Sequence, residues 1–192
     1  MKEMPKVLAD DRAHVPDRNL VMECQQGSRT AFRQLYQRHQ KRVRSTLYQL
    51  CGAALLDDLT QDVFLKAWKG LPKLRNPDYF GTWLYRICWN VAQDRRRSLA
   101  QNRDSDADQL AQSLGVTEAD LMQLHYQDLV QRGLQSLTLE HRAVLVLHDL
   151  EDVPQKEIAK ILDIRLGTVK SRLFYARTAM RQAIAAEVGE SL

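Results

Sequence analysis

The C-terminal stretch 153–184 combines a regular apolar pattern with basic side chains that could bind a polyanion. No Asp or Glu occurs in residues 164–186, whereas cations recur throughout. These cations are Arg165, Lys170, Arg172, Arg177 and Arg181. Positive charge without interspersed acids suits contact with the phosphates of a nucleic acid.

The same stretch is predicted to form two helices joined by a tight turn. Pro154 suits the first position of a helix, where its missing N–H costs nothing. Helix-turn-helix units usually carry Gly where Asp163 stands, and Asp is one of the few other residues that tolerate a left-handed backbone. The second helix has apolar residues at spacings of four, three, four and four. They are Val169, Leu173, Ala176, Met180 and Ile184.

Beside this stripe, the second helix presents Lys, Arg, Ser, Tyr and Phe on its exposed faces. Such groups can contact phosphates, base edges and thymine methyl groups. The alternative is a solvated basic helix without a partner. Phe174 and Tyr175 argue against it, because solvation does not require aromatic side chains there.

Two further segments carry exposed groups of mixed chemistry. The helix predicted near 54–71 buries Leu56 and Val63, and its opposite face carries Asp58, Gln61, Asp62 and Leu65. A leucine among acids suggests a protein-binding patch, although a solvated face is an equal alternative.

The helix predicted over 76–97 has Phe80, Leu84, Ile87 and Val91 on its core side. Its other side combines aromatic, amide and guanidinium groups, which suit unpaired bases that stack and are read on their edges. An amphipathic helix with incidental arginines remains the alternative. The residues of this side are Thr82, Arg86, Trp89, Asn90, Gln93 and Arg97.

Long apolar periodicities predict an all-α fold of two small helical domains joined by a flexible acidic linker. With 8 Gly and 5 Pro in 192 residues, a turn-rich β fold is disfavoured, and no strand pattern is convincing. A polar arm is expected at 1–16, a first domain at 17–97, the linker at 98–116 and a second domain at 117–188. Asn76-Pro77 is expected to start a helix, and Thr117 to Asp120 resembles a capping box. The predicted helices span 17–26, 28–51, 54–71, 76–97, 118–135, 138–150, 154–162 and 167–187.

Bulk properties agree with a nucleic-acid partner and exclude several other classes. The net charge is +4 and the pI is about 9.0. Cys24, Cys51 and Cys88 form neither a disulfide framework nor a CxxC metal site, so buried thiols are expected, with a metal or redox role as the minority interpretation. No run is apolar enough to span a membrane, and the N-terminus is not a signal peptide. No nucleophile–base pair, metal cluster or phosphate-binding loop is present, so neither catalysis nor a cofactor is expected.

Four segments together resemble one family. The pattern L-x-x-x-x-R-x-V-L-x-L in residues 137–147 is shared by response-regulator helix-turn-helix domains and by domain 4 of bacterial sigma factors. AFRQLYQRH, DDLTQDVFLKAW, FGTWLYRICWNVAQDRRR and EIAKILDIRLGTVKSRLFYAR occur in the order and spacing of the extracytoplasmic-function (ECF) sigma factors. The resemblance covers about residues 18–97 and 120–187.

The resemblance implies an alternative sigma factor that directs core RNA polymerase to specific promoters and helps to melt the −10 element. Domain 2 would bind the clamp helices of the largest polymerase subunit through Asp58, Gln61, Asp62 and Leu65. It would bind −10 DNA through Arg75, Asn76, Tyr79, Arg86, Trp89, Asn90, Gln93 and Arg97. Domain 4 would face the bases of the −35 element with Lys170, Ser171, Phe174 and Tyr175, and mostly its phosphates with Arg172, Arg177 and Arg181.

Two departures leave the promoter sequence open. Many relatives have Arg or His at the position of Tyr175, and the loop 73–79 lacks the Gly-rich pattern common in the family. The resemblance also implies a cytoplasmic protein regulated by an anti-sigma factor, often membrane-anchored, which could hold the chain at the inner face of the membrane without direct insertion. The acidic linker, with Asp104, Asp106 and Asp108, is hypothesised to follow the polymerase channel that later holds RNA; a plain solvated tether is the alternative.

Two other functions stay open from the sequence. A stand-alone helix-turn-helix activator or repressor would bind duplex DNA without polymerase and usually has an α/β sensory domain, which the all-helical first block disfavours. An enzyme with a DNA-binding tail is the third class. The inducing signal, the regulon and the anti-sigma factor are not encoded in any recognisable motif.

Overall fold

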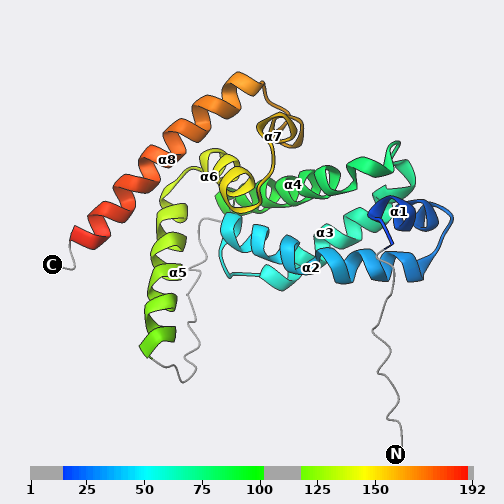
Figure 1. The fold of residues 1–192 in the computed structure, drawn as a ribbon, viewed down its shortest axis with the longest axis horizontal. Helices are drawn as coiled ribbons and strands as arrows, with labels where there is room; N and C mark the ends of the chain where they lie inside the picture. The colour runs from blue at the N-terminus through cyan, green and yellow to red at the C-terminus, as the bar shows by residue number, and fades with distance from the viewer. Residues whose placement is uncertain (1–14, 102–117, 190–192) are drawn as a thin grey trace, which may run out of the picture.

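The computed structural model describes residues 15–101 and 118–189, and every regular element in these ranges is helical (Figure 1). The predicted all-α class with two helical domains is therefore confirmed. Nearly all of the predicted N-terminal arm lies outside the described residues, as do the capping residue Thr117 and the linker acids Asp104, Asp106 and Asp108.

The N-terminal block, defined here as the described residues 15–101, packs its helices around one apolar core. Its longest early helix starts at Ser28, whose hydroxyl accepts a hydrogen bond from the Ala31 N–H, as predicted. That helix ends at Gly52, where φ is 78°, a backbone that favours glycine. The elements are α1 (Asp17–Gln25), α2 (Arg29–Cys51), α3 (Leu56–Gly70), the 3₁₀ turns η1 (Leu71–Lys73) and η2 (Pro77–Tyr79), and α4 (Phe80–Gln101).

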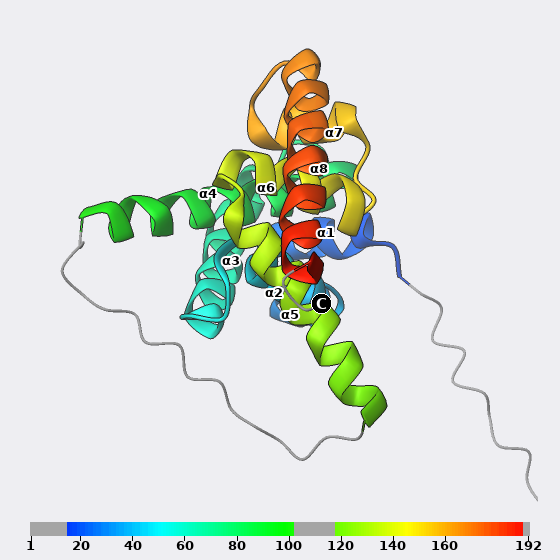
Figure 2. The same ribbon diagram turned by 90° about the vertical axis from the view of Figure 1, so that its left-hand side faces the viewer.

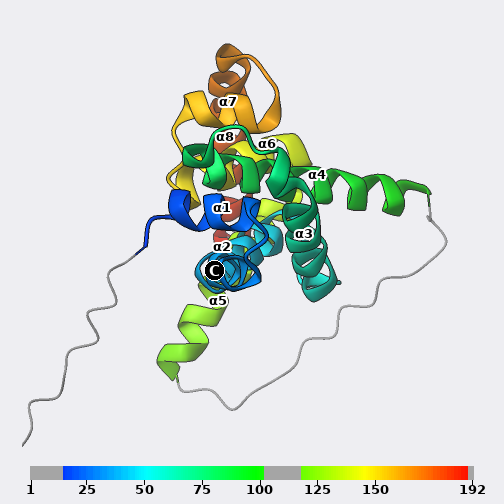
Figure 3. The ribbon, with the colours of Figure 1, turned by 90° about the vertical axis from the view of Figure 1, so that its right-hand side faces the viewer.

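Helix α4 has the predicted length of 22 residues but starts and ends four residues later than predicted. Asn76 does cap the chain, because its side chain accepts a hydrogen bond from the Asp78 N–H, but the cap opens the short turn η2 before α4 begins. At the other end α4 continues past Arg97 to Gln101. Its C-terminal half extends away from the rest of the molecule, as Figure 2 and Figure 3 show from two sides.

The C-terminal block, defined here as the described residues 118–189, contains the predicted helix pair. Asp163 adopts φ 55° and ψ 50°, which confirms that Asp fills the left-handed position of the turn. Thr138 caps the second helix of the block through a hydrogen bond from the His141 N–H. The elements are α5 (Glu118–Ser136), α6 (Leu139–Leu145), the π-helical turn η3 (Val146–Leu150), α7 (Gln155–Leu162) and α8 (Leu166–Gly189).

The two blocks pack directly against each other. One apolar cluster lies wholly within the N-terminal block, around Leu35, Val63 and Phe80. A second cluster is built mainly by the C-terminal block but includes Leu50 from α2 and Trp89 from α4. The C-terminal block thus completes its core with side chains of the N-terminal block, and α7 packs against α4 (Figure 1).

Arg142 of the 137–147 pattern joins helix ends from both blocks. Its guanidinium donates to the Leu50 carbonyl at 2.6 Å, the Gln135 carbonyl at 2.9 Å and the Leu137 carbonyl at 3.0 Å. Carbonyls at helix C-termini lack partners within their own helix, so a forked donor satisfies several at once. Burial lowers the pKa of Arg142.

We predict that Asp163→Val destabilises the protein by about 1–2 kcal/mol, because a β-branched residue is strained in the left-handed region, whereas Asp163→Gly is tolerated. Urea unfolding followed by circular dichroism measures both. Gln182→Val, on the exposed surface of α8, is the control and should cost only about 0.5 kcal/mol through helix propensity. Equal losses at 163 and 182 would contradict the strain argument.

We also predict that Arg142→Lys lowers the free energy of unfolding by about 2 kcal/mol, because an ammonium cannot reach three carbonyls in the geometry of a guanidinium fork. Arg132→Lys on the exposed surface of α5 is the matched control and should change stability by less than about 0.5 kcal/mol. If the two variants unfold at the same urea concentration, Arg142 does not join the helix ends as described.

Candidate functional site

The acidic patch of α3 is exposed as expected. Asp58, Gln61 and Leu65 are exposed, and Leu65 keeps 49% of its surface in contact with solvent. The Asp62 side chain is 47% exposed and lies 3.2 Å from Lys66 Nζ. The four predicted residues therefore share one accessible face of one helix.

A groove beside this patch was not predicted from the sequence. It has a volume of about 880 Å³ between α2 and α3, and Gln61 and Leu65 of the patch line one side of it. Its floor consists of two edge-to-face aromatic pairs, Phe32 with Trp68 at 4.8 Å and Tyr36 with Phe64 at 4.6 Å between ring centroids. The sequence did carry a signal for this groove, because α2 and α3 each have two aromatic residues four positions apart, which places both rings on one face of the helix.

The face of α4 predicted to bind unpaired bases is only partly accessible. Arg86, Asn90 and Arg97 are exposed, and Gln93 is half-buried. Trp89 differs, because only 6% of it is exposed. The prediction of an exposed aromatic at position 89 is wrong for this structure; the reason is that the core of the C-terminal block closes over its ring.

The predicted flipped-base loop contributes three accessible residues. Arg75 and Asn76 are exposed, and the Asn76 side chain is already engaged with the Asp78 N–H. Tyr79 is 48% exposed, and the Lys160 ammonium of α7 lies 5.1 Å from its ring centroid. A cation at this distance is attracted to the ring face.

A buried carboxylate links the blocks beside Trp89. Glu151 ends the π-helical turn η3 and is 8% exposed. Its Oε2 accepts hydrogen bonds from Arg42 Nε at 2.7 Å and the Tyr85 hydroxyl at 2.8 Å, and the Thr46 hydroxyl lies 3.0 Å from Oε1. The hydrogen bond to Glu151 raises the pKa of Arg42, and burial together with this carboxylate raises the pKa of Tyr85. No sequence pattern had singled out these four residues.

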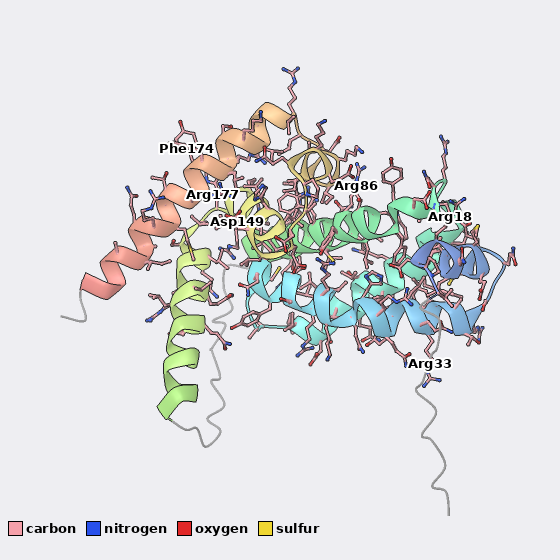
Figure 4. The ribbon with its side chains drawn as sticks, viewed as in Figure 1. Arg18, Arg33, Arg86, Asp149, Phe174 and Arg177 are labelled. Atoms are coloured by element: carbon pink, nitrogen blue, oxygen red, sulfur yellow. The ribbon has the colours of Figure 1, made fainter. Side chains whose placement is uncertain are left out.

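Helix α8 presents its predicted face to solvent. Phe174 is 66% exposed and Tyr175 is 60% exposed, with their ring centroids 5.5 Å apart. Lys170, Ser171 and Arg181 are exposed too, and Arg172 is half-buried. In Figure 4, Phe174 projects from α8 away from the rest of the molecule. Aromatic rings with so much exposed surface contribute little to folding, so this face of α8 is available for a partner.

Arg177 is held by its own chain. Its Nε and Nη2 donate to the two carboxylate oxygens of Asp149 at 2.9 and 2.6 Å, and His148 Nδ1 lies 2.6 Å from Asp149 Oδ1 (Figure 4). The hydrogen bonds from Arg177 lower the pKa of Asp149. One cation of the predicted phosphate contacts is therefore oriented, and partly neutralised, by a neighbouring acid.

The cysteines and acids of the described residues form no metal centre. Cys24 and Cys88 are buried and Cys51 is half-buried. Burial raises the pKa of the Cys24 thiol to about 11, which leaves little reactive thiolate at neutral pH. Within 15–101 and 118–189, no three His, Cys, Asp or Glu side chains are grouped so that they could hold a metal ion. None of the helices in these ranges has the length and apolarity that a membrane span requires.

Solved structures share this fold. CnrH, solved in complex with the cytosolic domain of CnrY, superposes with a TM-score of 0.66 at 26% identity, covering 88% of this chain and 97% of that one. The sigma factor RpoE from Bartonella quintana, solved in complex with the anti-sigma factor NepR, has a TM-score of 0.62 at 19% identity, covering 80% of this chain and 96% of that one.

Sequence comparison identifies the family. Residues 35–103 match the model for Sigma-70 region 2, and residues 127–180 match Sigma-70, region 4. The ECF RNA polymerase sigma-E factor of Escherichia coli (strain K12) is 31% identical over 175 residues, which is 85% of this chain and 92% of that protein. Its counterpart from Haemophilus influenzae is 30% identical over 179 residues, 88% of this chain and 95% of that protein. The chain thus belongs to the ECF RNA polymerase sigma factors, which are transcription initiation factors and not enzymes.

Proposed function

We propose that three separate surfaces of this sigma factor divide the work of initiation. The α3 patch of Asp58, Gln61, Asp62 and Leu65 binds the clamp helices of the largest polymerase subunit. The exposed face of α8 reads the −35 duplex, and α4 with the loop before it binds the melted −10 strand. The observation that carries this proposal is the exposure, on one chain, of an acidic patch around a leucine and of a cationic face around two aromatic rings.

The polymerase surface is extended by the groove between α2 and α3. Its aromatic floor offers apolar contact, and Arg29, Lys41 and Arg44 stand among its lining residues. An apolar floor with charged groups around it suits a helical partner that inserts one or two apolar side chains. The acids of α3 then select a basic partner helix and orient it.

The two DNA-binding surfaces differ in chemistry, because α8 meets duplex DNA and α4 meets a single strand. Lys170, Ser171, Phe174 and Tyr175 lie where a helix in the major groove meets base edges, and Arg172, Arg177 and Arg181 supply charge for phosphates. Arg86, Asn90, Gln93 and Arg97 line the strand path on α4 with Arg75, Asn76 and Tyr79 at its start, and Trp89 joins them once it is uncovered.

Regulation by an anti-sigma factor is the second part of the proposal. RpoE from Bartonella quintana was solved with the anti-sigma factor NepR, and CnrH with the cytosolic domain of CnrY. A regulator that is anchored in the membrane would hold this chain at the inner face of the membrane, and on release the chain would act in the cytoplasm, where its polymerase is.

Run-off transcription with purified core polymerase tests the polymerase surface. We expect transcripts only when this chain is added, and we expect Asp62→Arg to abolish core binding, measured by size-exclusion chromatography and by anisotropy of labelled sigma factor. The exposed pair with Lys66 contributes little to stability, so the fold should remain intact.

Asp128→Arg is the matched control, since Asp128 also begins an exposed pair with the basic residue four positions later on a helix. It should bind core polymerase like the wild type. If the chain itself binds no core enzyme, the sigma-factor mechanism fails; if both variants bind normally, only the assignment of the patch fails.

Phe174→Ala should weaken binding of the −35 duplex about tenfold or more, because a lost base contact costs about 1–3 kcal/mol. Duplexes selected by the wild-type holoenzyme from a randomised library provide the ligand, and anisotropy measures affinity. Arg181→Ala, which removes an exposed cation assigned to a phosphate, should instead weaken all duplexes alike and reduce the slope of log K against log salt by about one.

Gln182→Ala, exposed on the same helix, serves as the control for these two variants and should leave affinity unchanged. Unaltered binding by Phe174→Ala, at unchanged thermal stability, would remove α8 as the reader of the duplex.

A further inference from the structure

The C-terminal block covers part of the surface that we assign to the unpaired −10 strand. The Trp89 ring lies in the same apolar cluster as Leu134, Leu137 and Val153 of that block, and Tyr85 packs against this cluster. A base cannot stack on a ring that is enclosed by protein. Contact of α4 with the strand therefore requires the blocks to separate.

We propose that in the free chain the C-terminal block is an internal competitor of the −10 strand, and that Glu151 is the latch that holds it in place. The inference rests on the proposed strand-binding role of α4. It adds a closed state of the sigma factor itself, without any regulator, in which the strand surface is occupied.

Glu151 suits this role because the partners of its carboxylate belong to the other block. Its carboxylate contacts Arg42, Thr46 and Tyr85, and its main-chain carbonyl accepts a further hydrogen bond from Arg42 Nη2 at 3.1 Å. A buried carboxylate deprived of these donors would be costly, so separation is opposed until water can reach it. Among the described residues, every hydrogen-bond partner of the Glu151 carboxylate lies in the N-terminal block.

A second group of contacts covers the start of the strand path. Glu157 Oε2 lies 3.2 Å from the Thr82 hydroxyl, and Lys160 stands over Tyr79 while paired to Glu157 at 2.8 Å. Farther along α4, Arg96 pairs with Glu140 at 2.6 Å. Carboxylates of the C-terminal block thus approach polar and cationic groups of α4 that phosphates would otherwise meet.

The closed state leaves the duplex reader open. Phe174 and Tyr175 remain exposed on α8. Phe174 projects from α8 on the side away from α4 (Figure 4). The latch should therefore reduce affinity for the single strand and leave affinity for the −35 duplex unchanged. This selectivity distinguishes opening of a latch from a general loss of folding or a general change in charge, either of which would alter both affinities.

The size of the effect follows from the closed population. When only a fraction of the chain is open, the apparent dissociation constant for the strand is the intrinsic value divided by that fraction. Opening variants can raise strand affinity at most by the reciprocal of the wild-type open fraction. We expect a gain of about tenfold or more.

The experiment uses the free full-length chain and a labelled DNA oligonucleotide with the non-template −10 sequence located by run-off start sites. Glu151→Gln places an amide N–H₂ against the donors of Arg42 and Tyr85. Arg42→Met removes the cationic partner of Glu151, which belongs to the N-terminal block. Both should raise strand affinity, increase the radius of gyration in X-ray scattering, and leave −35 duplex affinity unchanged. Tyr85→Phe, which removes one hydrogen bond, should give a smaller gain.

Asp128→Asn controls for the loss of one negative charge, since Asp128 is exposed on α5. This variant should leave the radius of gyration unchanged and should change strand affinity by less than about twofold. The proposal is overturned if Glu151→Gln and Arg42→Met open the chain without a gain in strand affinity. It is also overturned if wild-type scattering already shows separated blocks.

The proposed function is tested separately in the holoenzyme, with core polymerase bound to the chain. If Arg97→Ala does not impair strand opening there, the strand-binding role of α4 fails, whatever the free chain does. If Arg97→Ala impairs opening but the Glu151 and Arg42 variants bind the strand like the wild type, the latch alone fails.

Discussion

The arrangement of this molecule depends on the enclosure of one carboxylate between two helical blocks. Glu151 is taken out of water at the end of η3, and its charge is satisfied by Arg42, Thr46 and Tyr85. An ionised carboxylate that deep needs such donors, since its desolvation otherwise outweighs any packing gain. The position of Glu151 therefore sets where the C-terminal block can sit on α2 and α4.

The same constraint explains why α4 is apolar on more than one side. A helix with a single buried stripe would leave Trp89 and Ala92 in water, yet both are buried, because one side meets the N-terminal core and another meets the C-terminal block. An indole can serve two partners, since its faces pack against aliphatic side chains as well as against bases. A surface built for one apolar partner is therefore open to occupation by another.

Local signals in the sequence predicted most helices and their ends. Ser28, Asn76 and Asp163 act through hydrogen bonds or backbone angles within a few residues of themselves, so their roles could be read from neighbours in the chain. The stripe of Val169, Leu173 and Ala176 is likewise a property of one helix. The exposure of Leu65 and Phe174 followed from the same periodicity.

The features that were missed depend on contacts between distant segments. Periodicity placed Trp89 opposite the core of its own block and could not show that a second block lies there. The partners of Glu151 are separated from it by 66 to 109 residues. Arg177 looked like a free cation because Asp149, 28 residues away, is brought to it only by the packing of α8 on α6, which η3 follows directly.

An ionic latch has a consequence that an apolar one would lack. Only the Glu151 side of this ion pair is buried, since the Arg42 side chain is 55% exposed. The carboxylate gains from attraction to its donors about what it loses in desolvation, so the pair specifies one arrangement without making that arrangement very stable. The apolar contact of Trp89 supplies the attraction, and Glu151 restricts it to one register. A partner that pulls the blocks apart returns the Glu151 carboxylate to water, where it is well solvated, and exposes one aromatic ring on which a base can stack instead. The closed state can thus be well defined in structure and still open at low cost when polymerase and DNA are present.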